Sequence, residues 1–222
     1  MLALKHADAY RNEEDIMQGN RLIIIKEDGS REILHSNSWG GVKVSFAGQN
    51  ALCEIHESII VKKEFKIHIG EKCYCSIGSN VKIIRGDANI TYEGGTFIIG
   101  EGTTIGGIEA YGNHEKHLEI IIGKRCMISY GLLIRASDAH AIYDLATPDV
   151  CINKASFGCH IDDDVWIGQN VTLLKDANIP SFCVIGAGSV VGRKQFPEHC
   201  IIAGNPAKIV RENISWSRRK PF

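Results

Sequence analysis

The chain has 222 residues, of which 44% are hydrophobic and 23% charged, which are ordinary values for a globular protein. Lys and Arg number 25 and Asp and Glu 26, so the net charge is −1, which argues against a nucleic-acid-binding surface or a polybasic membrane anchor. Aliphatic runs reach only four residues, at 22–25, and residues 1–15 lack an apolar signal segment. We therefore expect a cytoplasmic protein without a membrane span.

The first third of the chain shows no clear repeat. Residues 1–20 are polar and are expected to form a short N-terminal cap. Strand-like runs follow at 21–25, 42–46 and 58–63, but their spacing is irregular. We interpret residues 21–66 as irregular first coils of the structure that the next segment defines.

A period of six residues organises the chain from about residue 67 to residue 193. It is clearest in six consecutive aliphatic positions: Ile161, Ile167, Leu173, Ile179, Ile185 and Val191. A small or β-branched residue lies four positions after each of the first five: Val165, Val171, Ala177, Cys183 and Ser189. Earlier hexads begin at Ile69, Ile77, Ile99, Ile105, Ile122, Ile128 and Ile134.

Period six matches neither the 3.6-residue repeat of a helix nor the two-residue alternation of a half-buried strand. It predicts short strands joined by tight turns, with the aliphatic residue inward and the small residue at a corner of a triangular coil. Three hexads, about 18 residues, would form one coil, coils would stack at about 4.8 Å, and the chain would hold roughly ten. The 23 glycines, against 5 prolines, are expected at the corners. Residues 194–222 would form a C-terminal tail.

The eight cysteines form no Cys-x-x-Cys pair. Cys73, Cys126 and Cys183 fall at the small inward position, which predicts buried thiols, and a reducing compartment would keep them free. The alternative is a zinc site that uses Cys53 with His56, or Cys159 with His160. No second ligand pair stands at the spacing that structural zinc requires.

The repeat is interrupted twice, and interruptions of a monotonous solenoid are where function is expected. The first interruption covers residues 109–121. The second is larger and predicts a protruding loop at about 138–160. His140 lies at the base of this loop, with Asp138 and Asp144 close in sequence. A loop histidine is either a surface residue or a candidate acid–base group.

Several ordered motifs carry a resemblance to a known family. SDAHAIYD, VWIGQNVTLLK, VIGAGSVV and IIAGNPAKIVRENISW, within about residues 95–216, resemble the hexapeptide-repeat acyltransferases. Within that family they are similar to bacterial capsule and O-antigen polysaccharide O-acetyltransferases, including those that modify polysialic acid. The resemblance implies an all-β, left-handed parallel β-helix, a homotrimer with sites between subunits, acetyl-CoA as acyl donor and a saccharide acceptor.

The resemblance also implies roles for single residues. His140 would be the general base, because a neutral imidazole is suited to remove the proton of a sugar hydroxyl as it attacks a thioester. Asp138 is a candidate to hold the other ring nitrogen. Direct transfer in a ternary complex is expected, and the alternative mechanism uses Cys151 or Cys159 as an acyl-enzyme nucleophile.

Donor and acceptor contacts follow from the same motifs. Strand alternation points Trp166 outward, where the family places a wall of the site; packing between subunits is the other interpretation. The donor-side candidates are Trp166, Lys175, Ala187, Gly188, Arg193, Lys208 and Arg211. The acceptor-side candidates are Glu109, Asn113, Asp138 and Tyr143.

Three other functions stay open. The acceptor could be a small sugar or amino sugar. A γ-type carbonic anhydrase would use His114, His117 and His140 as zinc ligands, whereas the acetyltransferase needs no metal. A non-catalytic scaffold would not bind CoA.

Overall fold

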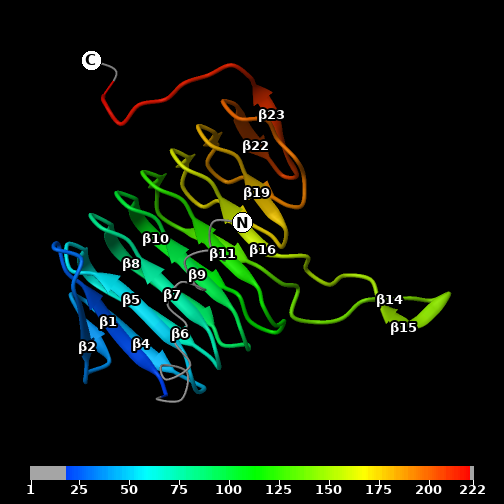
Figure 1. Cartoon of the computed structure of the whole chain (residues 1–222). Coiled ribbons are helices and arrows are strands. Elements are labelled where there is room, and N and C mark those ends of the chain that lie inside the picture. The colour runs from blue at the N-terminus through cyan, green and yellow to red at the C-terminus, as the bar shows by residue number, and fades with distance from the viewer. Residues whose placement is uncertain (1–18, 221–222) are drawn as a thin grey trace.

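Short strands separated by tight turns stack into a solenoid through residues 19–220, the part of the chain that the computed structural model describes (Figure 1). The predicted cap at 1–20 lies almost wholly outside this range. No helix between residues 19 and 220 is long and apolar enough to cross a membrane.

The first face of the solenoid is a parallel sheet with one strand from each coil. Its strands are β1 (Arg21–Ile25), β5 (Leu52–His56), β7 (Tyr74–Ile77), β9 (Thr96–Ile99), β11 (Glu119–Ile122), β16 (Gly158–Ile161) and β19 (Ala177–Ile179). The hairpin partner β2 (Arg31–Leu34) covers the outer edge of β1. This face therefore defines seven coils in the described chain.

The second and third faces belong to one continuous sheet. Three long strands run across the corner between these faces: β6 (Ile60–Ile69), β8 (Lys82–Ile90) and β10 (Thr104–Tyr111). Later coils have a separate strand on each face. The second face continues with β12 (Met127–Ile128), β17 (Trp166–Ile167), β20 (Val184–Ile185) and β22 (Ile201–Gly204). The third face contains β4 (Val42–Phe46), with its partner β3 (Ser38–Trp39), then β13 (Leu132–Arg135), β18 (Thr172–Leu173) and β21 (Val190–Val191).

Coil length differs between the two halves of the solenoid. Leu52 lies opposite Tyr74, and Tyr74 opposite Thr96, so each of these coils has 22 residues. Cys159 lies opposite Ala177, which gives the 18-residue coil that the hexads predict. The prediction of roughly ten coils was wrong, because the connection from the third face to the first is longer in the early coils and because the protruding loop adds residues to one coil. Phe97 follows Ala88 by nine residues, whereas at the equivalent positions Ala177 follows Leu173 by four.

The predicted inward positions form the core. The six aliphatic residues from Ile161 to Val191 are each at most 1% exposed. Cys73, Cys126 and Cys183 are buried at the corners, as predicted, and all eight cysteines are free. Full burial of one aliphatic side chain contributes about 1.5–3 kcal/mol, so the hexad residues supply the main stabilising term.

One corner shows what the glycines do. A Cβ on Gly123 would lie 2.5 Å from the backbone of Asp162 in the next coil, so glycine permits close stacking there. The left-handed conformation of the same corner falls instead on Arg125 and on Asp164, with φ of 55° and 56°. Glycine is thus present at this corner, as expected, but it does not carry the left-handed conformation.

The segment predicted as a tail begins inside the solenoid. After β21, strand β22 pairs in parallel with β20 and folds back as β23 (Ala207–Arg211). Only the residues after β23 leave the sheet, and they return along the earlier coils.

Candidate active site

The second interruption projects from the solenoid between β13 and β16, as predicted (Figure 1). It carries a small antiparallel hairpin made of β14 (Tyr143–Asp144) and β15 (Thr147–Cys151). Leu145 at its tip is 100% exposed, and Ile142, Tyr143, Val150 and Ile152 are also exposed.

Polar contacts close the base of this loop. The Asn153 side-chain amide donates to the Asp138 carboxylate and to the His140 carbonyl, both at 2.9 Å. The Lys175 ammonium pairs with Asp138 and donates to the Asn153 carbonyl at 2.7 Å. The hydrogen bond from Lys175 holds the pKa of Asp138 below its ordinary value.

These contacts show where two residues with predicted roles lie. Lys175 was expected at the donor, but it lies at the loop base because β18 brings it beside the chain that leaves β13. Asp138 was expected to face the acceptor or hold the His140 ring. Its carboxylate instead contacts Asn153 and Lys175, and among residues 19–220 no hydrogen bond joins it to that ring.

The His140 side chain is exposed, and Ala139 before it has a φ of 66°. The two interruptions meet here, because the Ser137 hydroxyl donates to the Asn113 carbonyl at 2.6 Å. The Glu115 carboxylate accepts from the Ala155 N–H at 3.1 Å on the returning limb. The first loop thus contacts both limbs of the second loop, at Ser137 and at Ala155.

Glu109 points outward from β10, and the Tyr111 hydroxyl donates to it at 3.4 Å. Both line a shallow groove of about 750 Å³ on the third face. Lys63, Lys66 and Arg85 also line this groove, together with acidic residues. It provides polar side chains of both signs next to a predicted acceptor contact.

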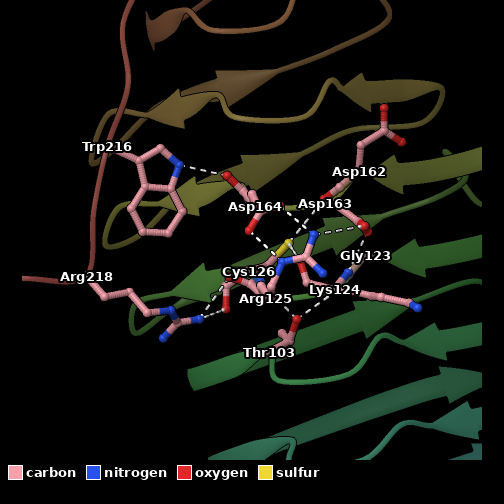
Figure 2. Close-up of polar contacts among 10 residues, drawn as sticks. All are labelled: Thr103, Gly123, Lys124, Arg125, Cys126, Asp162, Asp163, Asp164, Trp216 and Arg218. Atoms are coloured by element: carbon pink, nitrogen blue, oxygen red, sulfur yellow. Dashed lines mark hydrogen bonds and ion pairs between the residues drawn. The ribbon is translucent and has the colours of Figure 1, made fainter.

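Trp166 points outward from β17 and is 39% exposed, as the strand alternation predicts. Its ring lies 6.1 Å from that of Trp216, which comes from the segment after β23. The Trp216 indole N–H donates to the Asp164 carbonyl at 2.7 Å (Figure 2). Trp216 was present in the resembling motif, but it received no role from the sequence.

Ala187 and Gly188 form the corner after β20. A Cβ on Gly168 would lie 2.7 Å from the Ala187 nitrogen, so the backbones of these two coils approach closely. The Gly188 N–H donates to the Gln169 carbonyl at 2.8 Å. This corner presents backbone and small side chains to solvent.

The other predicted donor contacts lie in or after the last coils. Lys208 and Arg211 are exposed on β23. Arg193 follows β21; its side chain is 73% exposed and lies 3.9 Å from the buried carboxylate of Asp176. These three cations remain on the surface, in contrast to Lys175.

His140 and Trp166 lie on different parts of the solenoid. His140 follows a strand of the third face, whereas Trp166 belongs to the second face. No described contact joins them within residues 19–220. One chain therefore presents the two predicted catalytic residues on separate surfaces.

The structure does not assemble the alternative sites. Within the described chain, no three His, Cys, Asp or Glu side chains lie together as metal ligands, and His114, His117 and His140 are not brought together. Cys159 is buried, which raises the pKa of its thiol to about 12 and disfavours a thiolate nucleophile. Cys151 is partly exposed, and its thiol contacts Asn153.

No family model matches the chain. The chain is similar to a polysialic acid O-acetyltransferase of Escherichia coli O1:K1 / APEC, with 39% identity over 146 residues, which are 65% of this chain and 45% of that protein. It is similar to the polysialic acid O-acetyltransferase of Neisseria meningitidis, with 35% identity over 101 residues, 46% of each chain. The matches thus span less than half the length of either relative.

The fold extends the likeness over nearly the whole chain. The crystal structure of the polySia-specific acetyltransferase NeuO matches with a TM-score of 0.77 and 32% identity, and the match covers 92% of this chain and 87% of the NeuO chain. The solenoid therefore has the left-handed parallel β-helix architecture that the hexads and their resemblance predict. On these grounds the chain belongs to the hexapeptide-repeat acetyltransferase family.

Proposed function

We propose that this protein is an O-acetyltransferase that moves an acetyl group from acetyl-CoA to a hydroxyl of a bacterial surface saccharide, either a capsule or O-antigen polymer or its precursor. The observation that carries the proposal is the match to NeuO over 92% of the chain. The names of the two curated relatives favour an acidic polymer, polysialic acid, as the first acceptor to test.

His140 would act as the general base. Its imidazole is exposed at the edge of the solenoid, while Asn153 holds its backbone carbonyl. The base would take the proton from the sugar hydroxyl as the oxygen attacks the thioester carbonyl. The CoA thiolate then leaves, so the acetyl group passes directly from donor to acceptor within a ternary complex.

The acetyl-CoA donor fits the last coils. Its anionic head needs cations, and Arg193, Lys208 and Arg211 are exposed there. Its extended arm needs a flat surface with small side chains, and the corner at Ala187 and Gly188 provides one. A direct transfer is favoured over an acyl-Cys159 intermediate because burial suppresses that thiolate.

The acceptor would lie between the loop and the third-face groove. Glu109 lines this groove, while Asn113 lies on the first loop, next to Ser137. Tyr143 is exposed on the hairpin, where its ring could stack on a sugar. A small sugar or amino sugar would use the same contacts. The experiment below distinguishes such an acceptor from a polysaccharide.

A homotrimer would complete the site. The separation of His140 from Trp166 on one chain calls for a neighbouring chain to supply the second residue. The hairpin tip, with Leu145 fully exposed among other apolar side chains, favours contact with such a neighbour. The eight free thiols favour a reducing, cytoplasmic compartment.

The test is incubation with acetyl-CoA and a panel of saccharides, which includes polysialic acid, neutral polymers, nucleotide sugars and small amino sugars. Release of the CoA thiol gives the rate, and NMR of the product gives the acetylated hydroxyl. Saccharide-dependent thiol release supports the proposal. Absence of release with every acceptor, or stoichiometric zinc whose removal abolishes the activity found, contradicts it.

A further inference from the structure

The residues after β23 run back along one corner of the solenoid and bind to four coils. We call residues 214–218 the tail strap. The Ile214 N–H donates to the His199 carbonyl at 2.9 Å, and the Trp216 indole N–H donates to the Asp164 carbonyl at 2.7 Å. Further along, the Arg218 guanidinium donates to the Arg125 carbonyl at 2.9 Å and to the Cys126 carbonyl at 2.7 Å. It also donates to the Thr104 hydroxyl at 2.9 Å.

An ion pair links two coils at the corner under the strap. Arg125 donates two hydrogen bonds to the Asp164 carboxylate, at 2.9 and 2.6 Å, and one to Asp163 at 3.3 Å (Figure 2). These carboxylates raise the pKa of Arg125 above its ordinary value. The carbonyls of Arg125 and Asp164 are also strap acceptors, so the strap rests on a corner whose two coils are joined by this ion pair.

Trp216 is the strap residue that reaches the second face. Its ring centroid lies 6.1 Å from that of Trp166, with the planes tilted by 45°. This geometry is favourable for two aromatic rings. Trp166 stands on a strand of two residues and is 39% exposed, so Trp216 provides a fixed surface for its outward side chain.

We propose that Trp216 is a positioning residue for the acyl donor and acts by holding the Trp166 indole in one orientation. The inference rests on the proposed function, in which Trp166 borders the thioester. Arg218 anchors the strap, because its bonds to three residues of two earlier coils fix the chain beyond Trp216. The tail strap is thus part of the donor site although it lies outside the repeat.

The experiment compares full-length variants by steady-state kinetics with acetyl-CoA varied at saturating acceptor. Trp216→Ala should raise the KM for acetyl-CoA about threefold to tenfold, with a smaller change in kcat, since an aromatic pair of ordinary strength is lost. Trp216→Phe should restore most of the affinity. Arg218→Ala should shift KM in the same direction, whereas Arg219→Ala, a neighbouring exposed arginine, should leave it unchanged.

A binding readout separates this inference from the reaction itself. Fluorescence titration with CoA measures the dissociation constant for the wild type and for Trp216→Ala, at a temperature where near-UV circular dichroism shows both folded. A weaker CoA complex in the variant supports the positioning role even if no saccharide is acetylated, in which case only the proposed reaction fails. An equal KM and an equal dissociation constant in the two proteins, or no CoA binding by the wild type, would overturn the inference.

Discussion

The side-chain amide of Asn153 donates a 2.9 Å hydrogen bond to the backbone carbonyl of His140. Asn153 lies on the limb of the loop that returns to the solenoid, and His140 on the limb that leaves it. The bond therefore closes the loop at its base, and it locates the backbone of His140 while the imidazole stays exposed. A general base needs both, a fixed position and access to its substrate.

His140→Ala should lower kcat by at least about a hundredfold, because proton removal from the acceptor hydroxyl would lose its base. CoA affinity should be retained, since the donor contacts lie on the last coils. Steady-state kinetics and CoA titration measure the two effects. His35→Ala, which changes an exposed histidine on the first coil, is the control. Near-normal turnover of His140→Ala would remove it as the base.

Lys208→Glu combined with Arg211→Glu should weaken acetyl-CoA binding, because two exposed cations beside a polyanionic head become anions. The loss should shrink as salt is raised. Arg219→Glu with Lys220→Glu makes the same charge change on exposed tail residues and serves as the control. A dissociation constant that stays the same in Lys208→Glu/Arg211→Glu would exclude this pair from the donor site.

A mixture of His140→Ala chains and Trp166→Ala chains tests whether the site lies between subunits. If His140 of one chain works with Trp166 of the next, about a quarter of the sites in randomly mixed trimers contain both wild-type residues. Activity should then rise after subunit exchange above the activity of either variant alone. The molar mass measured by light scattering shows whether the mixed chains form trimers. Failure to recover any activity in verified mixed trimers would place both residues in one chain's site.

The ion pair at the loop base makes a prediction about pH. The pKa of Asp138 is lowered mainly by its hydrogen bond from Lys175, so the charged pair stabilises the loop above the ordinary aspartate pKa of 3.8. The stabilisation should disappear as the pH falls through the lowered value. Hydrogen exchange of the Ile142 and Ile152 amides, corrected for intrinsic rates, measures the stability of the closed loop at each pH.

Lys175→Met keeps the length of that side chain and removes its charge. The variant should show faster exchange of the loop amides already at neutral pH, with little further change on acidification. Wild-type protection in this variant would mean that Asn153 alone closes the loop.

The core pattern predicts a contrast between neighbours. Ile185 points inward with 0% exposure, so Ile185→Ala should destabilise the fold by about 2–5 kcal/mol. Val184, the adjacent outward residue, is half-buried, and Val184→Ala should cost less than about 1 kcal/mol. Urea denaturation followed by circular dichroism measures both. An equal loss of unfolding free energy in the two variants would contradict the assignment of Ile185 as inward and Val184 as outward.

Hexad periodicity alone determines the direction of each core side chain, because in a short strand neighbours alternate between the interior and the surface. It therefore predicted that Ile185 and Cys183 are buried and that Trp166 points outward. The same pattern located the second interruption, but the first, predicted at 109–121, is only the turn at 112–118, because β10 continues to Tyr111 and β11 begins at Glu119. The early coils do not follow this pattern, because their connections from the third face to the first are longer and break the six-residue spacing.

Only the stacked structure decided which distant residues meet. Lys175 reaches Asp138 across 37 residues, and Trp216 reaches Asp164 across 52. Such pairs depend on the length of every coil between them and on the path of the chain after β23. A local pattern predicts which way a side chain points. Its neighbours in the next coil depend instead on the register between strands, and that register is fixed only once the length of every coil is known.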